Sequence, residues 1–169
     1  MSDIYNSLYS MLEPERYDKS TPMDMRRIEL GLALESMLEQ GIKARLSTHV
    51  GERPGEQTTE MAGRPVHYNP DLFLFDDNTF RVGEIKYSSM SNRQGVSHAK
   101  FNKWFTQMKL YCNAVQTPYA RLYGFFSNGD YTHPYTPSLN AYDIEFTPRE
   151  LRDEWDTAIA HGRNVGMFK

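Results

Sequence analysis

The chain has 169 residues, a length that suits one domain, and its 39% hydrophobic content is enough for a buried core. A formal net charge of −3 excludes a generally basic nucleic-acid-binding protein, so contact with DNA or RNA needs a local basic strip or a metal ion. The one cysteine, Cys112, excludes an internal disulfide, a cysteine-ligated zinc site and an iron–sulfur cluster.

The first predicted elements are an N-terminal arm at 1–24 and a helix at about 25–41, which is rich in Leu, Met, Ala and Glu and ends at Gly41. The start of the chain lacks the pattern of a signal peptide, and no segment approaches the roughly 20 apolar residues of a membrane span. We therefore expect a cytoplasmic protein without a membrane partner. Residues 43–50 favour a strand, and the Gly- and Pro-bearing residues 51–65 favour a loop, at the rim of an active site or as its lid.

Two strands are predicted at 66–76 and 79–87, with an Asp-Asp-Asn turn between them. A second helix is predicted at about 99–116, followed by strands at 119–126 and 141–146. The last helix opens at the Thr-Pro-Arg-Glu sequence after them, which is a capping box with proline at the first helical position. This order predicts an α/β (α+β) fold, a mixed central sheet flanked by helices.

Two acids and a lysine gather on the predicted hairpin. Side chains alternate along a strand, so Glu84 and Lys86 share one face, and the hairpin brings Asp71 nearly opposite Glu84. Neighbouring carboxylates repel one another unless a cation lies between them, and hard oxygen ligands favour Mg²⁺ or Mn²⁺. A lysine beside such an ion orients or deprotonates a bound water. Taken singly, Glu84-x-Lys86 also fits a surface pair, and Asp71 also fits a turn.

The two predicted helices add polar residues to this set. Glu35 falls within the apolar arc of the first helix, where a carboxylate is costly unless it is paired or binds a metal. The alternative is a Glu at the edge of that arc, reaching solvent. One edge of the second helix carries polar residues at i, i+3, i+4 spacing that suit phosphate contacts: Lys100, Lys103, Gln107 and Tyr111. An ordinary solvated helix edge is the alternative for this strip.

In this order the motifs resemble the PD-(D/E)xK nuclease superfamily, in particular its RecB-like and lambda-exonuclease-like branch. The matching segments are Gly31-Leu-Ala-Leu-Glu35, Pro70-Asp71, Glu84-Ile85-Lys86 and Gln107-Met-Lys-Leu-Tyr111. The resemblance covers 25–126 and implies a restriction-endonuclease-like core within a single domain of 1–169, to which 141–169 adds a strand and a helix.

The resemblance also implies hydrolysis of DNA phosphodiester bonds with one or two Mg²⁺ or Mn²⁺ ions. It assigns four groups to the metal: Asp71, Glu84, the backbone carbonyl of Ile85 and Glu35. Lys86 is then expected to position or activate the attacking water. Gln107 and Tyr111 are expected to support the site and to contact the substrate strand, beside Lys100 and Lys103.

The chain departs from part of that branch. No histidine precedes Glu35, unlike in the RecB-like helicase-nucleases, and the cysteine cluster of the iron–sulfur members is absent. The chain is thus most similar to the phage-encoded type, and we expect an exonuclease-like enzyme of phage or bacterial DNA processing, recombination or repair. One alternative, favoured by the negative charge, is a virion component in the head, portal or tail, which binds DNA, other phage structural proteins or copies of itself. The two readings combine in a virion-associated nuclease. A restriction-type endonuclease is a further alternative, although 169 residues leave little room for a recognition domain.

Overall fold

The computed structural model describes residues 54–76, 78–134 and 136–168, together with residues 29, 33–34, 36–38 and 40–41. The predicted arm at 1–24 and the predicted strand at 43–50 lie outside these described residues. Within the predicted helix at 25–41, every described residue is helical, and the remainder, Glu35 among them, lies outside the description.

The centre of the fold is a four-stranded mixed sheet. Its strands, in spatial order, are β3 (Leu72–Asp76), β4 (Thr79–Ser88), β5 (Tyr119–Phe126) and β6 (Ser138–Glu145). The β3–β4 and β5–β6 pairs are antiparallel, and the β4–β5 pair is parallel. Parallel neighbours need a crossover connection, and the helix between β4 and β5 supplies it.

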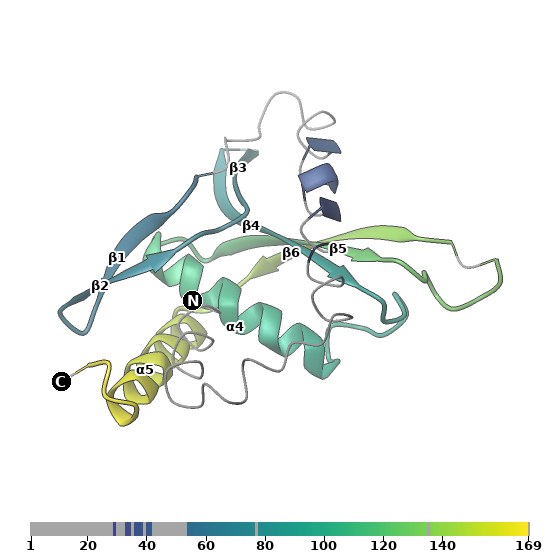
Figure 1. The fold of residues 1–169 in the computed structure, drawn as a ribbon. Coiled ribbons are helices and arrows are strands. Elements are labelled where there is room, and N and C mark those ends of the chain that lie inside the picture. Colours follow the sequence, from purple (N-terminus) through teal and green to yellow (C-terminus); the bar gives the residue numbers. More distant parts are fainter. Residues whose placement is uncertain are drawn as a thin grey trace.

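Helices cover both faces of this sheet (Figure 1). α4 (Ala99–Ala114) and α5 (Pro148–Asn164) lie together on one face. On the other face, Leu38 packs against a buried cluster formed by Leu72, Leu74, Ile85 and Tyr123. The predicted mixed sheet flanked by helices is therefore confirmed. Among the described residues, neither helix is both long and apolar enough to cross a membrane.

The predicted loop at 51–65 is wrong, because most of it is a β-hairpin. β1 (Gln57–Met61) and β2 (Arg64–Tyr68) pair antiparallel as a separate two-stranded sheet. Ala62 and Gly63 form the connection with φ angles of 51° and 76°, the positive values that a two-residue hairpin turn of type I′ requires. In a sequence that otherwise resembles a polar loop, this Ala-Gly pair is the feature that indicates a hairpin turn.

The predicted strand at 66–76 is also wrong, because it is two strands. β2 ends at Tyr68 and β3 begins at Leu72. Between them Pro70 is buried, and a proline has no N–H with which to continue a ladder of hydrogen bonds. The interruption leaves Asp71 immediately before the first paired residue of β3, and this placement builds the site described below.

The later elements follow the prediction closely. α4 and β5 agree with it to within two residues, and β6 begins three residues earlier than expected. The capping box of α5 is confirmed: Thr147 Oγ1 accepts from the Glu150 N–H at 3.2 Å, and Glu150 Oε2 accepts from the Thr147 N–H at 2.8 Å. The acidic α5 packs on the core through Leu151, Trp155 and Ile159.

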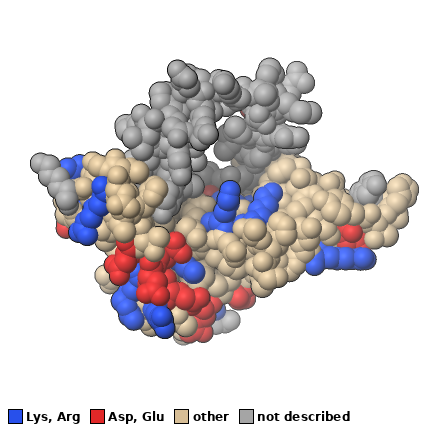
Figure 2. All heavy atoms as spheres, turned by 90° about the horizontal axis from the view of Figure 1, so that it is seen from below, with Lys and Arg blue, Asp and Glu red and all other residues tan. Residues whose placement is uncertain are grey.

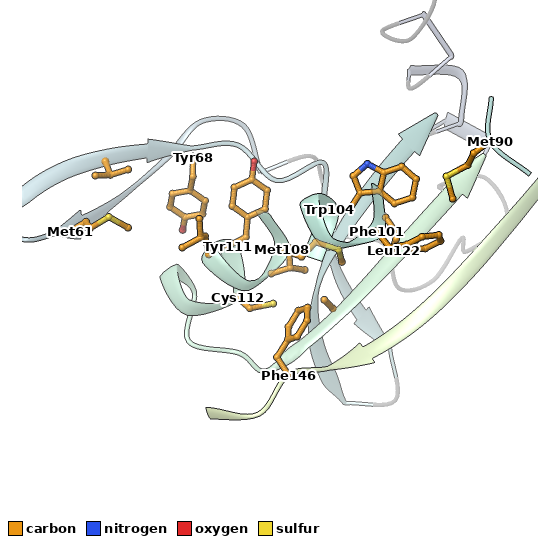
Figure 3. Packing of buried hydrophobic residues seen from close by; sticks show 14 of the residues in the cluster. Met61, Tyr68, Met90, Phe101, Trp104, Met108, Tyr111, Cys112, Leu122 and Phe146 are labelled. Atoms are coloured by element: carbon orange, nitrogen blue, oxygen red, sulfur yellow. The ribbon is translucent and has the colours of Figure 1, made fainter. Parts of the chain in front are cut away.

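The main core lies between α4 and the sheet (Figure 3). Phe101, Met108 and Cys112 from α4 meet Leu122 and other residues of β5, all fully buried. Each such apolar side chain contributes roughly 1.5–3 kcal/mol to stability when buried. Burial also raises the pKa of the Cys112 thiol to about 12, so this cysteine behaves as a small apolar residue.

Candidate active site

Asp71 lies where β3 begins, directly beside β4. The first pair of the β3–β4 register is Leu72 with Gly83, so the next positions along the same hairpin are Asp71 and Glu84. Asp71 is only 8% exposed, and its Oδ2 accepts a hydrogen bond from the Ile85 N–H at 2.7 Å. A side-chain carboxylate thus takes the place that a carbonyl of β3 would occupy if that strand continued.

Glu84 and Lys86 extend from β4 toward the layer of α4. Val82, two residues before Glu84 on the same face, belongs to the main core, so this face is apolar up to the carboxylate. Glu84 is 2% exposed, and Lys86 donates a hydrogen bond to its Oε1. A charge buried to this degree is costly without a partner, and Lys86 supplies one.

The backbone of β4 adds a third oxygen to this corner. The N–H and C=O of one strand residue point to the same side, because paired residues exchange both hydrogen bonds. Since the Ile85 N–H points to Asp71, the Ile85 carbonyl faces that same side. Asp71, Glu84 and this carbonyl are hard oxygen donors, the kind that Mg²⁺ prefers.

The two carboxylates are a donor set that Mg²⁺ accepts. Within the part of the chain that the structure describes, no group of three His, Cys, Asp or Glu side chains is placed to hold an ion. Mg²⁺ is commonly held by one or two carboxylates, with waters and substrate phosphates as its other ligands, and two carboxylates are present here. The predicted role of Glu35 falls outside the described residues and stays a prediction.

Gln107 and Tyr111 of α4 reach the segment that carries Asp71. Gln107 Nε2 donates to the Tyr111 hydroxyl at 2.8 Å, and that hydroxyl donates to the Asn69 carbonyl at 3.4 Å. Tyr111 is 2% exposed, and its ring lies beside that of Tyr68, with centroids 5.8 Å apart (Figure 3). This burial favours the predicted supporting role of Tyr111 over a direct contact with substrate.

The two lysines of the predicted strip have different surroundings. Lys100 Nζ donates to Ser88 Oγ at 2.9 Å and lies 5.8 Å from the centre of the Trp104 ring. Its partial burial lowers the pKa of Lys100. Lys103 is exposed. Sequence reasoning missed Ser88, although the alternation that groups Glu84 with Lys86 continues to it.

Charged side chains of both signs lie on the described surface. On the face drawn in Figure 2, the described Lys and Arg side chains stand in separate groups, with Asp and Glu side chains among them. The N-terminal cap of α4 belongs to His98, whose Nδ1 accepts from the Lys100 N–H at 3.2 Å. His98 therefore has a local structural role.

Comparison with known proteins adds support for the fold alone. No protein-family model matches the chain, and no curated protein does. Among solved structures the chain is similar to the crystal structure of SSO0001, with a TM-score of 0.58 and 16% sequence identity. The match covers 94% of this chain and 68% of that one. At this identity the similarity supports the mixed α/β architecture and carries no statement about activity.

The hydrogen bond between Asp71 and the Ile85 N–H predicts a difference between two substitutions. Asp71→Ala leaves that buried N–H without its acceptor, which costs roughly 1–3 kcal/mol of unfolding free energy. Asp71→Asn keeps an oxygen in the same place and is expected to cost less than half as much. Urea unfolding of both variants measures the difference, and equal losses would show that this hydrogen bond contributes little.

Proposed function

We propose that this protein is a Mg²⁺-dependent nuclease of the PD-(D/E)xK type that hydrolyses DNA phosphodiester bonds in phage or bacterial DNA processing. One observation supports the proposal above all others. Asp71, Glu84 and Lys86, which the sequence motifs single out, lie at one corner of the sheet, where β3 begins and β4 continues past it. The chemistry of that corner is two buried acids, a backbone carbonyl and an amine.

Each residue has a distinct part in this proposal. Asp71, Glu84 and the Ile85 carbonyl would hold Mg²⁺, which when bound offsets charge on the phosphate and acidifies a coordinated water. Lys86 Nζ, kept in place by Glu84, donates a hydrogen bond to the attacking water or to a phosphate oxygen. The contact from Tyr111 to the Asn69 carbonyl fixes the backbone next to Asp71, so that its carboxylate is already oriented.

The proposal is tested by incubating the protein with linear and circular DNA in Mg²⁺ or in EDTA. We expect cleavage in Mg²⁺ only, and a loss of at least about a hundredfold in Lys86→Ala, since a positioned proton-transfer group contributes 10²–10⁴-fold. Cleavage confined to linear DNA indicates an exonuclease, and cleavage of both forms indicates an endonuclease.

The control is Arg149→Ala, which removes a highly exposed cation from α5 and is expected to cleave like the wild type. Cleavage that persists in EDTA would contradict the proposal. So would a Lys86→Ala variant as active as Arg149→Ala.

A further inference from the structure

We propose that Lys100, held by Ser88, binds the backbone phosphate next to the one that is cleaved. This inference rests on the proposed function, because it takes the position of the cleaved phosphate to be beside Lys86. It gives the substrate strand a path, along the last residues of β4 and beneath the first turn of α4.

The path follows from the alternation of side chains along β4. Glu84, Lys86 and Ser88 share one face, and positions two residues apart on a strand are separated by about 7 Å. Lys100 comes from a different element and ends on Ser88, with its Nζ 2.9 Å from Ser88 Oγ. Lys86 and the Ser88 that holds Lys100 are therefore successive positions on this face of β4, and their spacing along the strand is comparable to one nucleotide step of an extended strand.

Lys100 is held in place before any ligand arrives. Ser88 is 1% exposed, and its Oγ also accepts from the Met90 N–H at 3.1 Å, which fixes the hydroxyl that Lys100 contacts. The Trp104 ring supports the ammonium group from a second side. Binding through a side chain that is already ordered loses less conformational entropy than binding through a mobile one.

The ammonium group of Lys100 has capacity for an anion. It has three N–H donors, and Ser88 takes one of them. Among the described residues Lys100 forms no ion pair, and the first turn of α4 contains no acid. On the same helix Lys109 is neutralised by Glu154 at 3.7 Å. A partly buried cation that forms no ion pair with the described residues is stabilised by a phosphate, which compensates for its lost hydration.

The test uses short oligonucleotides, each with one neutral methylphosphonate linkage, moved stepwise across the cut site. In the wild type, a neutral linkage at one position flanking the cut is expected to slow cleavage about tenfold, because it removes one charge-assisted contact. In Lys100→Gln all fully charged DNA is cleaved about tenfold more slowly, and the neutral linkage at that position has no further effect. Lys100→Arg keeps the charge, so a neutral linkage at that position should again slow cleavage in this variant.

Lys103→Gln is the matched control, since it removes an exposed lysine from the same helix. It should slow the cleavage of every oligonucleotide by the same small factor. A Lys100→Gln variant that keeps the wild-type dependence on position would overturn the inference. A uniform loss together with a lower unfolding temperature would also overturn it, because that result marks Lys100 as purely structural.

Binding measured with Ca²⁺ in place of Mg²⁺ separates this inference from the proposed function. If the wild type binds the oligonucleotides but does not cleave them, the nuclease proposal fails, and the same comparison of positions is made on dissociation constants. If the dissociation constant of Lys100→Gln no longer depends on the position of the neutral linkage, the phosphate contact is supported. If it still depends on that position as in the wild type, the phosphate contact is overturned. If the wild type binds none of them, both proposals fail.

Discussion

Glu84→Gln is expected to reduce Mg²⁺-dependent DNA cleavage on the order of a thousandfold, because loss of a metal ligand removes several kcal/mol of transition-state stabilisation. The substitution keeps the volume of a side chain that is 2% exposed, and the amide oxygen still accepts from Lys86. We therefore expect the variant to fold. Initial cleavage rates at saturating Mg²⁺, with thermal unfolding measured alongside, separate the loss of activity from loss of structure.

The matched control for this substitution is Glu145→Gln, which changes an exposed acid at the end of β6. It removes the same charge from the same sheet and is expected to cleave like the wild type. A Glu84→Gln variant that retained a tenth of the wild-type rate would argue against a metal-binding role for this carboxylate. A folded variant whose rate recovered in excess Mg²⁺ would place the defect in metal affinity.

Gly83→Ala is expected to destabilise the protein by about 1–3 kcal/mol and to lower cleavage by up to about a hundredfold. A Cβ at this position would lie 2.8 Å from the Leu72 Cβ and 3.3 Å from a Leu74 methyl carbon. The Leu72 Cβ is attached to the backbone of the neighbouring strand, so β3 itself must shift. Asp71 precedes Leu72, and the shift therefore moves its carboxylate relative to Glu84.

The stability change is measured by urea unfolding, and the change in activity by cleavage at saturating Mg²⁺. Gly95→Ala is the control, because nothing lies within 4 Å of the Cβ that it adds. A Gly83→Ala protein of unchanged stability and activity would show that β3 accommodates the methyl group without moving Asp71.

The elements with strong periodicity and clear end signals were predictable. α4 carries an apolar stripe and β5 an apolar run, and the bounds of both agree with the prediction to within two residues. The capping box of α5 correctly gave the start of that helix. The hairpin of β1 and β2 was missed, since its polar, alternating residues resemble a loop until the Ala62-Gly63 turn is recognised. Pro70 was a visible signal for the end of a strand, but the apolar residues after it concealed the interruption.

The candidate site was predictable where it depends on local geometry. A hairpin with a short turn fixes which residues face each other, so the proximity of Asp71 and Glu84 follows from the sequence. The burial of Tyr111 depends on Tyr68 from a hairpin that was not predicted, and the contact between Lys100 and Ser88 joins residues from two elements. Such contacts depend on how layers pack, which periodicity does not encode.

The register of β3 and β4 determines where the chain can change in length while Asp71 and Glu84 still face each other. Five residues, 72–76, separate Asp71 from the turn, and five, 79–83, separate the turn from Glu84. An insertion within the turn leaves these arms equal, so the two carboxylates stay opposite each other. A single deletion in one arm reverses the face of every residue beyond it. Homologous chains that share this chemistry should therefore differ in length at the turn and not within the arms.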